Sequence, residues 1–144
     1  MYRGQYQGKF VPDNPEKYVG DANNIVYRSS WERRFCQYAD RNEKVLRWAS
    51  EEVVVPYLSP IDKKLHRYFI DFWVEVQAKD EVKKFLIEIK PSQFCKPPQK
   101  RRSKQYLQEA AGYAVNKAKW IAASKFAKRN GMEFLVITEK DLGI

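Results

Sequence analysis

The stretch HRYFIDFWVEVQAKDEVKKFLIEIK, residues 66–90, carries the strongest structural signal of the chain. It contains two runs rich in aromatic and β-branched residues, 66–77 and 82–90, and such runs are typical of strands. The connection at 78–81 is short enough for a tight turn between neighbouring strands. The sequence therefore predicts an antiparallel β-hairpin.

The charges and apolar residues of the hairpin predict its register. Facing positions have numbers with a constant sum, which sets Glu75 opposite Lys84 as an opposite-charge pair. One face is then wholly apolar, with the pairs Val74–Phe85, Phe72–Ile87 and Ile70–Ile89. The other face sets Asp71 directly opposite Glu88, with Lys90 two residues further along. Two carboxylates and an amine are therefore expected to converge.

This combination of side chains indicates a metal-dependent hydrolase. Facing carboxylates in a half-buried sheet repel each other and lose hydration, so they favour a bound cation or a shared proton. Mg²⁺ usually takes one or two protein carboxylates, which makes Asp71 and Glu88 candidate ligands of Mg²⁺ or its substitute Mn²⁺. Lys90 would orient or deprotonate the water that attacks a phosphodiester, or stabilise the transition-state charge. The alternative is a solvated strand face with alternating charge.

The bulk composition favours one basic domain. A chain of 144 residues can bury a core without disulfide or metal staples. The net charge of +9 favours a polyanionic partner, and nucleic acid is the first candidate. With Cys36, Cys95 and His66 alone, the chain has too few ligands for a zinc site. No apolar run is long enough to span a membrane and no signal peptide is visible, so a cytoplasmic protein is expected.

The remaining elements predict an α/β fold, in which helices flank a mixed sheet on both faces. Ser29 followed by Glu32 has the spacing of a capping box and begins a helix. Helices are expected at 30–41, 103–129 and 138–142, further strands at 45–48, 52–58 and 133–138, and a loop at 91–104. Residues 1–27 are expected to form an arm or ordered loop that packs on or extends from a single domain at 28–144.

Several motifs resemble those of known nucleases. Asp71 followed by Glu88-Ile89-Lys90 looks like the PD-(D/E)XK signature, with Ile70 in place of the usual proline. More specific segments are similar to the head completion nucleases of tailed bacteriophages. They span nearly the whole chain: GKF at 8–10, NPEKY at 14–18, IVYRSSWERRF at 25–35, HRYF at 66–69 and TEKDL at 138–142.

The resemblance implies a restriction-endonuclease-like core of the TnsA type and a Mg²⁺-dependent DNA endonuclease. It also implies a role in phage head completion after DNA packaging, with DNA and head, portal or neck proteins as partners. The expected location is the host cytoplasm or the virion. Glu32 fits the acidic residue that often precedes the signature, which makes it a further catalytic and metal-ligand candidate. Its alternative role is to bond back to the backbone N–H of Ser29 as part of the helix cap.

A basic cluster follows the predicted active strand directly and is expected to hold DNA phosphates without reading sequence. It consists of Lys96, Lys100, Arg101, Arg102 and Lys104. The aromatic residues Tyr106, Tyr113 and Trp120 are expected to pack against the sheet rather than to stack on bases. The runner-up function is a non-catalytic structural head-completion or DNA-binding protein with a nuclease-like fold. An RNA-binding module is less favoured, because no RNP-like aromatic motif is present.

Overall fold

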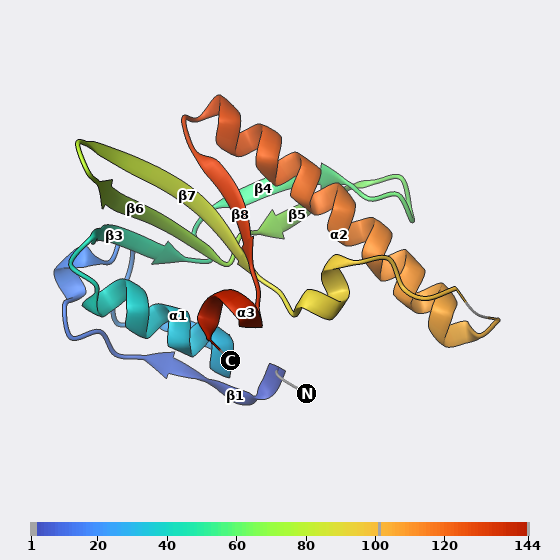
Figure 1. Ribbon diagram of the computed structural model, residues 1–144, viewed down its shortest axis with the longest axis horizontal. Coiled ribbons are helices and arrows are strands. Elements are labelled where there is room, and N and C mark those ends of the chain that lie inside the picture. The colour runs from blue at the N-terminus through green and yellow to red at the C-terminus, as the bar shows by residue number, and fades with distance from the viewer. Residues whose placement is uncertain (1–2, 101, 144) are drawn as a thin grey trace.

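The computed structural model describes residues 3–100 and 102–143, with side chains from Gln7 onward. At its centre lies a four-stranded mixed sheet in the order β3-β6-β7-β8. Its strands are β3 (Val45–Ser50), β6 (Phe72–Ala78), β7 (Glu81–Ile89) and β8 (Glu133–Ile137). Neighbouring strands are antiparallel except β7 and β8, which are parallel. The predicted α/β class with a mixed sheet is therefore confirmed (Figure 1).

Two long helices cover opposite faces of this sheet. They are α1 (Ser30–Arg41) and α2 (Lys104–Arg129), and their bounds match the two longest predicted helices within one residue. Along β7, Ile87 packs in the core beside α1, whereas its neighbour Leu86 packs in the core beneath α2. Successive residues of a strand point to opposite faces, so the two helices flank the sheet as predicted.

The second helix contacts the sheet with only part of its length. Trp120 packs in the core beneath α2 as predicted, together with the buried Ala123 and Ala127. Tyr106 and Tyr113 belong to neither core cluster, so their predicted packing against the sheet is wrong. The packed residues of α2 begin at Val115, and its first turns are left to form a separate surface.

The predicted hairpin register is confirmed along β6 and β7. The observed pairs include Phe72–Ile87, Val74–Phe85 and Glu75–Lys84. Glu75 also accepts two hydrogen bonds, of 2.9 and 3.0 Å, from the Arg47 guanidinium of β3. Charge pairing therefore extends across three strands of the sheet, and it disfavours a shift of register.

The predicted strand 66–77 is interrupted at Ile70 and Asp71. The residues before the interruption form β5 (Leu65–Phe69), which pairs with β4 (Val54–Leu58) in a separate two-stranded sheet. The residues after it form β6 of the central sheet. A single continuous strand was therefore the wrong expectation, and the chain changes sheets at this point.

Two backbone hydrogen bonds hold the interruption in place. The Ile70 N–H donates to the Val53 carbonyl oxygen at 2.9 Å, and the Glu51 N–H donates to the Asp71 carbonyl oxygen at 3.1 Å. Ile70 consequently packs in the core beneath α2 and not on the apolar face toward α1. The predicted pairing of Ile70 with Ile89 is therefore wrong.

The N-terminal segment contains regular structure where an arm or loop was expected. It comprises β1 (Arg3–Phe10), η1 (Pro15–Lys17) and β2 (Ile25–Ser29), and β1 pairs antiparallel with β2. The rings of Phe10 and Tyr18 lie 5.9 and 4.8 Å from the buried Trp48 ring. These apolar residues are isolated among polar ones, so the local pattern did not indicate their burial. The expected domain boundary between 27 and 28 falls inside β2.

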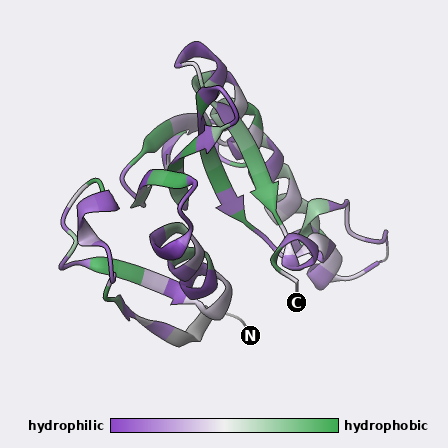
Figure 2. Ribbon diagram, turned by 60° about the vertical axis from the view of Figure 1, so that its left-hand side comes forward, coloured by the Kyte–Doolittle hydropathy of each residue, from purple (hydrophilic) through white to green (hydrophobic). Residues whose placement is uncertain are grey.

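Two short elements complete the described chain. They are η2 (Ser92–Cys95), which lies within the predicted loop, and α3 (Glu139–Leu142). A capping box between Thr138 and Asp141 begins α3. Hydrophobic residues follow the central strands (Figure 2). No helix within the described ranges is long and apolar enough to cross a membrane.

Candidate active site

The interruption between β5 and β6 positions Asp71 beside the end of β7. Its side chain Oδ2 accepts a hydrogen bond of 2.8 Å from the Ile89 N–H. This bond takes the place of the predicted direct pairing of Asp71 with Glu88, because the ladder ends at Phe72–Ile87. The carboxylate is thereby fixed against the strand that carries Glu88 and Lys90.

Glu88 is a buried carboxylate with a specific partner. Its side chain is 6% exposed, and its Oε1 accepts a hydrogen bond of 2.8 Å from the Tyr68 hydroxyl. Burial raises the pKa of Tyr68, and the nearby charges of Glu88 and Asp71 raise it further. The hydroxyl therefore remains a proton donor at neutral pH. The charge of Asp71 also acts on this pKa, so Asp71 lies within electrostatic reach of the Tyr68 hydroxyl, and the predicted placement of Asp71 and Glu88 on one face stays a prediction.

Lys90 follows β7 directly and is only partly exposed. Its backbone N–H donates to the Ile137 carbonyl oxygen at 2.9 Å, which fixes the chain at the point where β7 ends. Burial raises the pKa of the nearby Cys95 thiol, the Lys90 charge lowers it, and the charges of Glu139 and Glu88 raise it. Lys90 and Glu88 thus lie within electrostatic reach of the same thiol, and their predicted convergence at one site stays a prediction.

The short helix η2 is tied to the C-terminal part of the chain beside this site. Glu139 accepts a hydrogen bond of 2.8 Å from the Ser92 N–H and a second one from the Ser92 hydroxyl. These bonds lower the pKa of the Glu139 carboxyl. The chain just after Lys90 is therefore anchored to α3.

The hydrogen bonds of Glu32 are those of a residue that caps the start of α1. It is 4% exposed, and its Oε1 accepts a hydrogen bond of 3.1 Å from the Arg28 N–H. The Ser29 hydroxyl lies 3.4 Å from its Oε2 and accepts from the Glu32 N–H at 3.1 Å. The bond to the backbone therefore reaches Arg28, one residue earlier than the expected Ser29. The predicted metal and catalytic role of Glu32 stays a prediction.

The donor atoms of the site suit a hard divalent cation. Across residues 3–100 and 102–143, no group of three or more His, Cys, Asp or Glu side chains is arranged to hold a metal. Glu32 thus does not join Asp71 and Glu88 in a preformed three-carboxylate centre. The remaining pair offers carboxylate oxygens, the ligand type that Mg²⁺ prefers, and Mg²⁺ commonly uses only one or two of them. The residues present therefore fit a Mg²⁺ or Mn²⁺ ion completed by water and phosphate oxygens.

The basic cluster lies around the start of α2. Lys96 lines an open groove together with Lys90. Lys100, Arg102 and Lys104 are exposed, and Arg101 lies outside the described residues. Of the described members, Lys96 is therefore the one that the structure places in the same groove as Lys90.

Tyr68 is the site residue that sequence reasoning missed. In a continuous strand, Tyr68 would share the face of Ile70 and Phe72, opposite to the face of Asp71. The interruption at Ile70 and Asp71 turns Tyr68 to the side of Glu88 instead. The signal that could have found Tyr68 is its position in HRYF, close before Asp71.

Comparisons with known proteins identify the family of the chain. Residues 42–139 match the family model described as TnsA-like endonuclease N terminal. The matched region contains Asp71, Glu88 and Lys90 but not Glu32, and its fold is restriction-endonuclease-like. The head completion nuclease of Enterobacteria phage T4 is 38% identical over 143 residues, which cover 95% of this chain and 93% of that protein. The chain therefore belongs to the family of phage head completion nucleases, which has a TnsA-like endonuclease core.

Proposed function

We propose that this protein is a metal-dependent DNA endonuclease that hydrolyses phosphodiester bonds during phage head completion. One observation carries the proposal: the Asp71 carboxylate accepts a hydrogen bond of 2.8 Å from the N–H of Ile89, the residue between Glu88 and Lys90. The match to an endonuclease family over the same residues supports the reaction. The name of the phage T4 relative supports the stage of assembly and makes head proteins candidate partners.

Asp71 and Glu88 would hold the divalent cation. When bound, such a cation lowers the pKa of a water molecule and neutralises charge on the phosphate. The Ile89 N–H fixes the orientation of Asp71, and the Tyr68 hydroxyl fixes that of Glu88. Preorientation of this kind matters because a displaced ligand weakens both metal binding and catalysis.

Lys90 would act on the substrate from the mouth of the groove. Its ammonium group can donate hydrogen bonds to a phosphate oxygen or to the attacking water. Either contact places positive charge where the transition state gains negative charge. The backbone bond from Lys90 to Ile137 holds the residue at the end of β7, so this position is defined by the sheet.

The basic cluster would hold the DNA backbone near these residues. Lysine and arginine bind phosphates without regard to base sequence, and they gain free energy by releasing counterions. Lys96 lines the groove, and Arg102 and Lys104 are exposed at the start of α2, so these residues would supply such contacts. The expected affinity is therefore general for DNA and sensitive to salt.

A nicking assay on supercoiled plasmid tests the proposed reaction. The purified protein is expected to convert the plasmid to its nicked form with Mg²⁺ or Mn²⁺ and to leave it intact with a chelator. A protein that never nicks DNA with either ion would favour the non-catalytic alternative, a structural head-completion or DNA-binding protein with this fold.

A further inference from the structure

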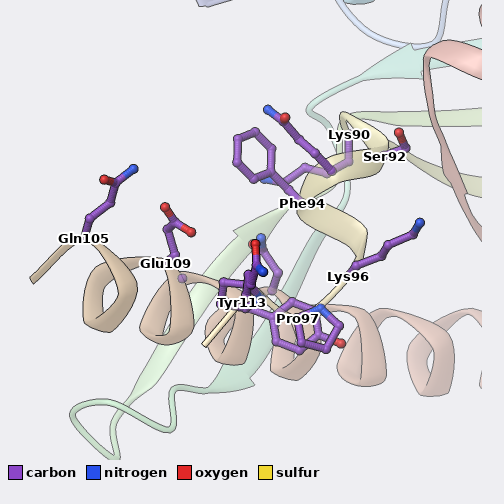
Figure 3. A pocket seen from close by; sticks show the side chains of 13 residues that line it. Lys90, Ser92, Phe94, Lys96, Pro97, Gln105, Glu109 and Tyr113 are labelled. Carbon is purple, nitrogen blue, oxygen red and sulfur yellow. The ribbon is translucent and has the colours of Figure 1, made fainter. Parts of the chain in front are cut away.

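An open groove of about 1020 Å³ lies beside Lys90. One wall is formed by η2 and the chain that follows it, and the other is formed by the first half of α2 (Figure 3). The side chains of Gln105 and Glu109 rise from α2 toward η2, which carries Phe94 (Figure 3). Because Lys90 lines this groove, the groove is continuous with the candidate active site.

The helix wall is built from residues that share one face of α2. Gln105, Glu109, Tyr113 and Asn116 follow each other at intervals of three or four residues, the spacing of one helical face. Gly112 lies on the same wall, and a Cβ atom added there would meet nothing within 4 Å. The groove is therefore open along the helix and is not filled by core side chains.

The lining presents three kinds of chemistry together. Phe94 is 45% exposed, which leaves an aromatic ring available at the rim. The walls also carry amide side chains that both donate and accept hydrogen bonds: Gln93, Gln99, Gln105 and Asn116. Lys90 and Lys96 add positive charge, and Glu109 is the acidic residue among the described lining.

An unpaired nucleic-acid strand offers the complementary groups. It presents the flat faces of its bases for stacking, their edges for hydrogen bonds and its phosphates for ion pairs. A continuous duplex conceals the faces of its bases within the helix stack. An exposed aromatic ring beside amides and lysines therefore matches an unpaired strand better than a duplex.

We propose that this groove binds an unpaired segment of the DNA substrate, with the Phe94 ring stacked on one base. The scissile phosphate at Lys90 then adjoins a single-stranded or frayed region. The preferred substrate is accordingly DNA with an end, gap or branch rather than a continuous duplex. The inference rests on the proposed function for the choice of DNA, but binding in the groove requires no cleavage.

Binding measured in a chelator separates the groove from the reaction. Fluorescence anisotropy compares a labelled single-stranded oligonucleotide with a blunt duplex of the same length. Phe94→Ala is expected to weaken single-strand binding about 5- to 150-fold, the loss of one stacked base, and to leave duplex binding unchanged. Phe94→Trp is expected to retain single-strand binding. Equal affinity of wild type and Phe94→Ala for the single strand would overturn the proposal, as would equal losses for both DNAs.

Phe69 supplies a matched control for Phe94. Its side chain is 47% exposed, but it lies on β5 beneath the Arg67 guanidinium, which is 5.6 Å from its ring. Phe69→Ala is expected to bind single strands as the wild type does. A loss equal to that of Phe94→Ala would show that exposed aromatic surface in general, rather than the groove, binds the strand, and it would contradict the proposal.

A second variant tests the groove by filling it. Gly112→Leu places a bulky side chain in open space on a helix, so the fold is expected to persist, and Gly112→Ala is its small control. Single-strand affinity should fall in Gly112→Leu and remain in Gly112→Ala, with thermal unfolding measured for both. Unchanged affinity in Gly112→Leu would contradict the proposal. If single-strand binding depends on Phe94 but the protein never nicks DNA, only the proposed endonuclease activity is refuted. If the protein nicks DNA but single-strand binding does not depend on Phe94, only the proposed role of the groove is refuted.

Discussion

The Tyr68 hydroxyl donates a hydrogen bond of 2.8 Å to Oε1 of Glu88, and both residues are buried. Tyr68 belongs to β5 of a two-stranded sheet, whereas Glu88 belongs to β7 of the central sheet. The bond therefore joins two sheets at the candidate active site. It also fixes one of the two carboxylates proposed to bind the metal.

Tyr68→Phe is expected to lower both stability and activity. The variant keeps the buried ring but leaves Glu88 without its hydroxyl donor, and an unsatisfied buried acceptor costs about 1–3 kcal/mol. Chemical denaturation measures the loss of stability, and the nicking rate reports the orientation of Glu88. A variant with wild-type stability and wild-type activity would show that this bond is dispensable.

Asp71 and Glu88 are expected to provide the protein ligands of the divalent ion. Asp71→Asn and Glu88→Gln keep the side-chain shapes and remove the charges, so each variant should lose Mg²⁺ and Mn²⁺ binding. Isothermal titration calorimetry in the absence of DNA measures this directly. Unchanged metal binding in both variants would show that other residues bind the ion.

Glu32→Gln separates helix capping from a role in the reaction. The amide oxygen can still accept the Arg28 N–H, so the stability of the variant should stay near that of the wild type. Glu32→Ala removes the acceptor and should cost about 1 kcal/mol. If Glu32 acts at the metal, Glu32→Gln folds normally and loses cleavage. Full cleavage by Glu32→Gln would assign this residue to the cap alone.

Charge reversal in the basic cluster is expected to weaken DNA binding for all sequences. Removal of one ion pair with a phosphate should reduce the magnitude of the slope of log K against log salt concentration by about 0.9 for duplex DNA. Arg102→Glu and Lys104→Glu test this, with Lys83→Glu on the distant hairpin as a matched control. An unaltered salt slope in the first two variants would show that DNA does not bind at the start of α2.

The local sequence pattern predicted the elements that local interactions determine. The register of β6 and β7 was predicted correctly, because the pair Glu75–Lys84 and the facing apolar residues are visible in the sequence. The helix start at Ser29 was predicted from its cap. Both signals involve neighbouring residues or one short hairpin.

The features that tertiary interactions determine were missed. The interruption at Ile70 depends on a backbone bond to Val53 from another part of the chain, which no local pattern displays. The aromatic and β-branched run from 66 to 77 continues through the interruption, so it indicated a single strand. Tyr68 was therefore not considered as a site residue, and its bond to Glu88 was not foreseen.

The single-turnover rate of plasmid nicking by Lys90→Ala tests whether this site cleaves DNA, and Glu88→Gln is its acidic counterpart. Glu81→Gln and Lys83→Ala provide controls, because these exposed residues lie at the opposite end of β7. With Mg²⁺, Lys90→Ala and Glu88→Gln are expected to nick at least about 100-fold more slowly than the wild type, while DNA affinity changes little in Lys90→Ala. The two controls are expected to nick at the wild-type rate. Wild-type rates in Lys90→Ala and Glu88→Gln would contradict a catalytic role of this site.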